Sequence, residues 1–186
     1  PQMSLLIRRK KRASASQTPR DTAVFVSFRD SDSSFRDSTS SLDSGTDFSI
    51  LGAANSLVVG DLNADGKLDI VTSSSSGIST LINTSTSTTL SFATSINISG
   101  NFSGVRLADI NLDGTLDLIT LNSSGINIYE NTTTSGAISY SLAINTAVSS
   151  FEGLDVGDLN GDGKYDVVIT KSGETQIYLN MRFSEN

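Results

Sequence analysis

The sequence contains no cysteine, no histidine and no tryptophan, and only two of its 186 residues are proline. Without cysteine the chain has no disulfide, no thiol nucleophile and no thiolate metal site, although an extracellular location stays open. The lack of histidine removes the commonest general base and the commonest ligand for transition metals. Any metal must therefore be held by oxygen ligands, which suit hard cations such as Ca²⁺.

Long hydrophobic runs are also missing. No apolar stretch approaches the roughly 18 residues that a membrane-spanning helix needs, so we expect no membrane insertion. The short apolar segment from Met3 to Ile7 is followed, not preceded, by basic residues, which is not the pattern of a signal peptide. The chain starts with Pro1, and we expect it to be a processed product or a fragment.

Positive charge is scarce outside the N-terminal segment. The chain has 13 basic and 20 acidic residues, a net charge of −7, and six of the basic residues precede the first acid, Asp21. Residues 21–186 therefore carry seven basic against twenty acidic residues, a net charge of −13. Because phosphate contacts need clustered lysine and arginine, this acidic body argues against nucleic-acid binding.

Residues 1–20 combine the basic run with Ser, Gln, Thr and Pro and show no strand or helix period. Three interpretations stay open for this basic arm: a flexible tail, a cleavage site for a basic-specific protease, or an arm that docks on an acidic neighbour.

A nine-residue motif occurs three times in the rest of the chain. It spans Asp61 to Asp69, Asp109 to Asp117 and Asp158 to Asp166, and the starts lie 48 and 49 residues apart. Self-similarity at a fixed period of about 20 to 50 residues is typical of a repeat architecture.

Strand patterns surround each motif in the same order. Apolar residues stand four and two positions before its first Asp, as Leu57 and Val59 do, and an aliphatic pair such as Ile70 and Val71 follows its last one. A third strand then opens near a glycine and ends at an asparagine, and weaker fourth strands are expected near Leu90 to Ile96 and Ile138 to Leu142. Four short strands per 48 residues indicate an all-β protein built from β-propeller blades. The expected divisions are 1–20 (basic arm), 21–56 (partial blade, with strands Val24 to Phe28 and Phe48 to Leu51, and a connection), 57–104, 105–153 and 154–186 (three repeats, the last truncated).

The motif itself predicts a calcium loop. In Asp-x-Asn-x-Asp-Gly-x-x-Asp, side-chain oxygens at positions 1, 3, 5 and 9 can converge on one ion, a carbonyl at position 7 joins them, and glycine at position 6 permits the reversal of the chain. Three crowded carboxylates would repel one another without a cation, so the ion should contribute to folding. The predicted side-chain ligands of the three Ca²⁺ sites are Asp61, Asn63, Asp65 and Asp69; Asp109, Asn111, Asp113 and Asp117; and Asp158, Asn160, Asp162 and Asp166; the predicted carbonyl ligands are Lys67, Thr115 and Lys164.

Two other interpretations of the motif exist. A single copy could be an acidic turn that only resembles a metal loop, but three copies in register argue against this. An EF-hand needs a bidentate Glu at position 12 and flanking helices, whereas position 12 here is Thr72, Thr120 or Ile169 within an expected strand.

The run Gly-Asp-Leu-Asn-x-Asp-Gly-Lys-x-Asp followed by a β-rich strand resembles the FG-GAP/VCBS repeats over roughly residues 48–182. These repeats build the calcium-binding β-propellers of integrin α-subunit heads and of many bacterial secreted and surface proteins. The resemblance implies an extracellular or cell-surface protein. The Phe-Gly half of the signature is only echoed, and the second repeat departs from the others at Ala108 and Leu112.

Three repeats are fewer than the four to eight blades that close a propeller. We therefore expect an incomplete ring unless other chains complete it, in a homo-oligomer or a polymeric assembly. The function we expect is non-catalytic: a structural, adhesion or self-assembly module. The alternatives are a carbohydrate-binding, lectin-like propeller and an accessory part of a polysaccharide-degrading enzyme.

The tyrosines and the glycosylation sequons also recur along the repeats. Tyr129, Tyr165 and Tyr178 are expected to pack between blades more than to stack on sugars. Glycosylation sequons begin at Asn83, Asn97, Asn101, Asn122 and Asn131, where turn chemistry explains Asn83 and Asn131 equally well.

Overall fold

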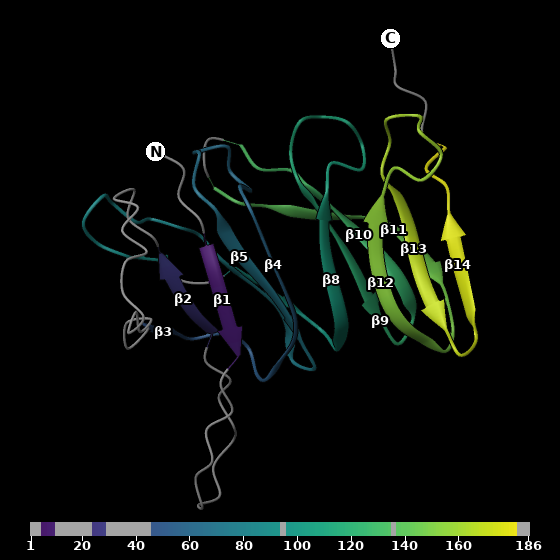
Figure 1. Cartoon of the computed structure of the whole chain (residues 1–186), viewed down its shortest axis with the longest axis horizontal. Helices are drawn as coiled ribbons and strands as arrows, with labels where there is room; N and C mark the ends of the chain where they lie inside the picture. The colour runs from purple at the N-terminus through teal and green to yellow at the C-terminus, as the bar shows by residue number, and fades with distance from the viewer. Residues whose placement is uncertain (1–4, 10–23, 29–45, 94–95, 135–136, 182–186) are drawn as a thin grey trace, which may run out of the picture.

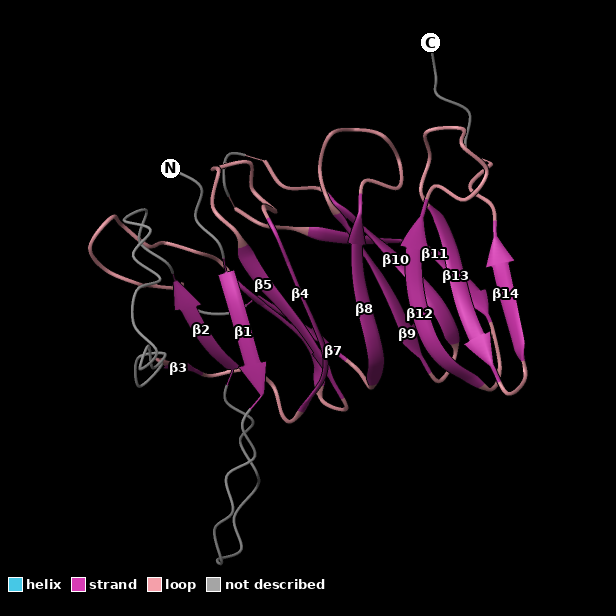
Figure 2. Cartoon of the chain, in the orientation of Figure 1, coloured by secondary structure: helices cyan, strands magenta, loops and turns pink. Residues whose placement is uncertain are grey.

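The computed structural model describes residues 46–93, 96–134 and 137–181, together with the backbone of residues 5–9 and 24–28. All regular structure in these residues is β-strand, arranged in four antiparallel sheets that follow one another along the chain (Figures 1 and 2). No described segment is a helix long and apolar enough to cross a membrane.

The four sheets form an open row and are not closed into a ring (Figure 1). We call the first the leading sheet and the other three blades 1, 2 and 3. The leading sheet has the order β1 (Leu5–Arg9), β2 (Val24–Phe28), β3 (Asp47–Phe48). Blade 1 is β4 (Ala54–Gly60), β5 (Asp69–Ser74), β6 (Gly77–Leu81), β7 (Ile96–Ser99); blade 2 is β8 (Phe102–Ala108), β9 (Asp117–Asn122), β10 (Gly125–Asn131), β11 (Tyr140–Ala147); blade 3 is β12 (Phe151–Gly157), β13 (Asp166–Lys171), β14 (Glu174–Tyr178).

Each blade is a simple meander in which consecutive strands pair. The first strands of neighbouring blades also lie close together, because β4 contacts β8 and β8 contacts β12. In propeller architecture the blades are arranged radially around a central axis. The contacts among β4, β8 and β12 therefore identify the side of the row on which such an axis would lie.

The hydrophobic core lies between the sheets. It forms three separate layers, one at each joint between consecutive sheets. Ile70 and Leu81 of blade 1 pack with Phe48 beside the leading sheet. Blades 1 and 2 share a layer that includes Leu62, Val71, Ile78, Phe102, Val105 and Leu118. Blades 2 and 3 share one that includes Ile110, Ile119, Ile128, Leu154, Val167 and Ile169.

Each blade therefore has two apolar faces: an incoming face toward the preceding sheet and an outgoing face toward the following one. Strand alternation explains how one strand serves both. In β9, Leu118 joins the layer with blade 1 and its neighbour Ile119 joins the layer with blade 3, and both are fully buried. This two-sided burial is why the sequence after each motif shows consecutive aliphatic residues.

The propeller-type fold expected from the sequence is confirmed, with three differences in the strands. The expected strand Phe48 to Leu51 is limited to β3, and the expected fourth strand at Leu90 to Ile96 begins only at Ile96. Leu90 and Phe92 instead pack in the first layer, so their apolar pattern reflects burial and not a strand. The fourth strand of blade 2 is β11, which begins at Tyr140 and is longer than predicted.

Residues 1–20 show no strand period in the sequence, yet β1 falls within them and pairs with β2. The strand predicted at Val24 to Phe28 is confirmed as β2. The rest of the basic arm and the Ser/Asp-rich connection after Phe28 lie outside the described residues.

Candidate calcium loops

The three motifs occupy the same place in the three blades. Each connects the first strand to the second, and the ninth residue of each motif begins the second strand: Asp69 in β5, Asp117 in β9 and Asp166 in β13. Figure 1 shows the three loops along the same edge of the row, at the top of the view, one in each blade. All the candidate sites therefore line one rim of the molecule.

In the first loop, backbone N–H groups donate hydrogen bonds to the side chains at positions 1, 3 and 5. The N–H of Asp65 donates to Asp61 Oδ1 at 3.2 Å and to Asn63 Oδ1 at 3.1 Å. Gly66 N–H donates to Asp61 Oδ2 at 2.8 Å, and Lys67 N–H donates to Asp65 Oδ1 at 2.9 Å. Two side-chain oxygens from different residues thus meet at one backbone N–H.

The other two loops repeat this arrangement. The N–H of Asp113 donates to Asp109 Oδ1 and Asn111 Oδ1, both at 3.0 Å. The N–H of Asp162 donates to Asp158 Oδ1 at 3.1 Å and Asn160 Oδ1 at 2.9 Å. The bond from the N–H at position 6 to the Asp at position 1 and the bond from the N–H at position 7 to the Asp at position 5 recur in both loops; the donors are Gly114, Thr115, Gly163 and Lys164.

Two residues of each loop have positive φ. Position 6 is a glycine with φ between 81° and 88° in the three loops, namely Gly66 at 81°, Gly114 at 88° and Gly163 at 81°. Position 4 also lies in the left-handed region, as Ala64 at 59°, Leu112 at 61° and Gly161 at 79°. Glycine is therefore suited to position 4 as well, and Leu112 holds a backbone conformation that strains an L-residue.

The Asp at position 9 of each loop is buried and is held by backbone hydrogen bonds. Asp69 is fully buried, with Oδ2 accepting a hydrogen bond from Leu62 N–H at 2.9 Å and Oδ1 accepting one from Asn83 N–H at 2.8 Å. These bonds tie the loop to the end of the third strand. Asp117 and Asp166 make the equivalent pairs of bonds, with Ile110 and Asn131 and with Leu159 and Asn180.

The electrostatics of the loops agree with this division between anchor and exposed acids. Burial raises the pKa of Asp69 above its usual value, the two backbone hydrogen bonds oppose the shift, and the nearby charges of Asp65 and Asp61 add to it. The pKa of Asp117 is raised for the same reasons. For Asp113 the effect of partial burial is outweighed by hydrogen bonds from Thr115 and Asn111, so its pKa lies below the usual value.

The carboxylate and amide oxygens of each loop are ligands that suit a calcium ion. The turn of the loop brings the side-chain oxygens of positions 1 and 3 together. Within the described residues, however, no three acidic side chains converge as a metal cluster. The acids at positions 5 and 9 are held by other groups of the protein. Asp65 accepts a hydrogen bond from the N–H of Lys67, and the Nζ of Lys67 lies 3.7 Å from Asp65 Oδ2. Asp69 accepts hydrogen bonds from the N–H groups of Leu62 and Asn83. Each carboxylate oxygen keeps a lone pair for an ion, because one hydrogen bond does not exhaust its accepting capacity.

In blades 2 and 3 the asparagine at the end of the third strand forms a hydrogen bond to the preceding blade, a role that the sequence interpretation missed. Asn131 of blade 2 donates from Nδ2 to the carbonyl of Leu62, in the loop of blade 1, at 2.8 Å, and to Leu116 in its own blade at 3.1 Å. Asn180 of blade 3 donates to the carbonyl of Ile110, in the loop of blade 2, at 2.8 Å. The regular asparagine 22 residues after each first Asp was the available signal.

The repeated geometry agrees with the comparison to known families. A model of the FG-GAP-like repeat matches residues 61–120 and 109–169, which together cover more than half of the chain. The chain belongs to the FG-GAP repeat family. No curated protein sequence matches it.

Several other residues of this FG-GAP protein can now be placed. Tyr129 and Tyr178 pack against layers between blades, as expected, whereas Tyr165 is exposed. Asn83 and Asn131 are buried, which explains these two sequons as turn and joint chemistry and not as glycosylation sites. One ion pair joins blades 2 and 3, between Arg106 Nε and Asp155 Oδ1 at 3.0 Å.

Proposed function

We propose that this chain is a non-catalytic, calcium-stabilised propeller module that serves as an extracellular structural, adhesion or self-assembly unit. The observation that supports this best is the recurrence of one loop geometry, with the same hydrogen bonds, in all three blades. Three copies along one rim fit a role in holding the fold together.

In the proposed sites the bound ion is held by the residues predicted from the sequence, with Asp61, Asn63, Asp65 and Asp69 in the first loop and their equivalents in the other two. The ion supplies positive charge among three carboxylates that otherwise repel one another. Because each loop joins the first and second strands of its blade, binding there stabilises the folded blade and not the unfolded chain.

Thermal unfolding with and without calcium tests this proposal. An excess of calcium at about 100 times the dissociation constant adds about 2.7 kcal/mol per site to the free energy of unfolding. We expect the melting temperature to rise with calcium and to fall when EGTA is added, with direct binding measured by calorimetry. No heat of binding together with an unchanged melting temperature would contradict the proposal.

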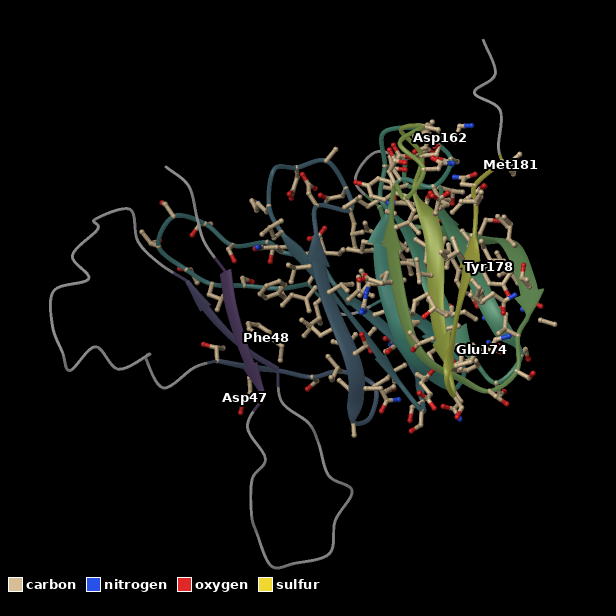
Figure 3. The ribbon with its side chains drawn as sticks, turned by 45° about the vertical axis from the view of Figure 1, so that its right-hand side comes forward. Asp47, Phe48, Asp162, Glu174, Tyr178 and Met181 are labelled. Carbon is tan, nitrogen blue, oxygen red and sulfur yellow. The ribbon has the colours of Figure 1, made fainter. Side chains whose placement is uncertain are left out.

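A matched pair of variants assigns the effect to the loops. Asp162→Asn removes one negative charge from the third loop, and Glu174→Gln removes one negative charge from the opposite end of blade 3. Figure 3 shows Asp162 and Glu174 at the two ends of that blade. We expect the first variant to lose one calcium equivalent in the titration and the second to bind like the unchanged protein.

The non-catalytic part of the proposal has its own test. Asp155, an acid outside the loops, forms an ion pair with Arg106 across the joint between blades, which is a structural role and not a catalytic one. Carbohydrate arrays and a panel of polysaccharide substrates separate the alternatives, since a lectin would bind a glycan and a hydrolase would release sugar. The proposal expects neither result. The extracellular location is tested by protease treatment of intact cells, which should digest the protein.

A further inference from the structure

The third loop contains the sequence Asn160-Gly161, and no other asparagine of the chain is followed by glycine. In the other two loops the residue after the asparagine is Ala64 or Leu112. The side-chain amide of an asparagine can be attacked by the backbone nitrogen of the next residue, and a glycine there carries no Cβ to hinder the approach. The third loop is therefore the one in which the asparagine is least shielded from this reaction.

The backbone nitrogen of Gly161 lies beside a carboxylate. Its N–H donates to Asp158 Oδ1 at 2.7 Å, which is a short hydrogen bond to a charged acceptor. A nucleophile and a base at this separation form the arrangement by which active sites activate a nucleophile. Among the described residues, neither Ala64 nor Leu112 donates an equivalent bond to the first Asp of its loop. The third loop thus differs from the other two in contact geometry as well as in sequence.

The side-chain amide of Asn160 is held by a second backbone group. Its Oδ1 accepts a hydrogen bond from Asp162 N–H at 2.9 Å. A donor at this oxygen stabilises the negative charge that develops there when Cγ is attacked. The bond also limits the rotation of the side chain, which lowers the entropy cost of closing a ring with the backbone. Both partners of the reaction are therefore held by groups that assist it.

We propose that Asn160 is a site of self-catalysed deamidation, in which Gly161 supplies the nucleophile and Asp158 accepts its proton. The nitrogen of Gly161 forms a bond to Asn160 Cγ, and the bond between Cγ and Nδ2 breaks. Asp158 passes the proton of the Gly161 N–H to the departing nitrogen, which leaves as ammonia. A succinimide ring remains in the backbone. Water then opens the ring at the side-chain carbonyl to give aspartate, or at the main-chain carbonyl to give isoaspartate.

Water has access to the reacting atoms. The hydrogen bond between Asn160 and Asp162 is exposed, and so are the equivalent bonds of the first two loops, so this exposure is a property of the loop itself. Conversion to aspartate adds a carboxylate to a loop that already carries Asp158, Asp162 and Asp166. The reaction needs only residues of the loop and water, and it stands apart from the proposed calcium role.

Peptide mapping by mass spectrometry tests the proposal on the whole chain, incubated at neutral pH in EGTA. We expect the amide of Asn160 to be replaced by a hydroxyl group over time, with aspartate and isoaspartate both present at this position. Asn63 and Asn111, which have the same place in the other loops, should stay intact over the same period. An Asn160 no more reactive than Asn63 would overturn the proposal.

Two variants separate the contributions of Gly161 and Asp158. Gly161→Ala should slow the conversion of Asn160 at least about tenfold, because a Cβ obstructs the approach on which the rate depends. The variant should fold, since Ala64 adopts a left-handed φ at the same loop position and a Cβ at Gly161 meets no atom within 4 Å. Asp158→Asn removes the proton acceptor and should slow the conversion about 100-fold.

Glu174→Gln is the matched control for Asp158→Asn, because it removes the same charge at the end of blade 3 opposite the loop (Figure 3). Circular dichroism establishes that all three variants fold. Equal rates in Asp158→Asn and Glu174→Gln would overturn the role of Asp158, and an unchanged rate in Gly161→Ala would overturn the attack by the Gly161 nitrogen.

Discussion

Replacing Asn131 with alanine should reveal how much the polar link between blades contributes to stability. Asn131 is almost fully buried at the joint of blades 1 and 2. Its Nδ2 group donates to the carbonyls of Leu62 and Leu116, and its Oδ1 accepts from the N–H of Thr133 at 3.0 Å and from the Thr133 hydroxyl. Alanine keeps the backbone bond from residue 131 to Asp117 and removes all of these side-chain bonds.

The expected loss follows from the number of bonds. A net contribution of about 1 kcal/mol for each of the three bonds to backbone groups gives a loss of about 3 kcal/mol in the free energy of unfolding. Total stabilities of domains are about 5 to 15 kcal/mol, so this loss is a large fraction of the whole. The substitution also leaves the carbonyls of Leu62 and Leu116 without this donor at the joint. Because an unsatisfied buried acceptor is costly, we do not expect a smaller loss of stability.

Asn83→Ala is the matched control, because Asn83 holds the same position in blade 1 without a described bond to another blade. Its Nδ2 donates to Leu68 in its own blade, and its Oδ1 accepts from Ser85 N–H. The loss should be about 2 kcal/mol, so the bond between blades accounts for a difference of about 1 kcal/mol.

Urea unfolding followed by far-ultraviolet circular dichroism and tyrosine fluorescence measures both variants. Hydrogen exchange adds a local readout: Asn131→Ala should speed exchange in both blades that meet at the joint, and Asn83→Ala in blade 1 alone. Equal destabilisation by the two variants, with the same exchange pattern, would refute the role assigned to the Leu62 contact.

Three further predictions concern single residues. Burial raises the pKa of Tyr140 to about 12, so the folded state favours the neutral phenol. The free energy of unfolding should therefore fall as the pH rises from 10 to 12, by up to about 3 kcal/mol in all, and Tyr140→Phe should abolish this part of the pH dependence in alkaline unfolding titrations. Leu112→Gly should raise the melting temperature, since relief of the left-handed strain outweighs the entropy of glycine by about 0.5 to 1 kcal/mol. Ile119→Ala should cost about 2 to 5 kcal/mol in urea unfolding, while Leu142→Ala on the surface should stay within about 0.5 kcal/mol.

Much of the fold was predictable because the repeat carries its own alignment. The alternation of apolar residues at Leu57 and Val59 predicts a strand that is covered on one face, and this strand is β4. The consecutive aliphatic residues Ile70 and Val71 predict a strand that is covered on both faces, and this strand is β5. The fourth strand of blade 1 was misplaced because the segment around Phe92 is apolar for another reason. The side chain of Phe92 packs in the layer beside the leading sheet, and its ring centroid lies 4.9 Å from that of Phe48.

The candidate site was predictable in its residue types but not in its division of labour. Spacing places Asp61, Asn63, Asp65 and Asp69 in one loop, and their roles as calcium ligands stay a prediction. No local pattern distinguishes Asp69, which is fully buried and bonded to Asn83, from Asp65, which is exposed. That distinction depends on the third strand returning to the loop, which is a property of the folded blade.

The three hydrophobic layers have a consequence for how such chains change in length. Every joint is formed by the same two kinds of face, so inserting or deleting one whole repeat creates no new kind of contact. Stability in such a row is approximately a sum over neighbouring pairs. Gene duplication can therefore lengthen the row one blade at a time while each existing joint stays as it is. A fold with one central core would have to be repacked after every such step.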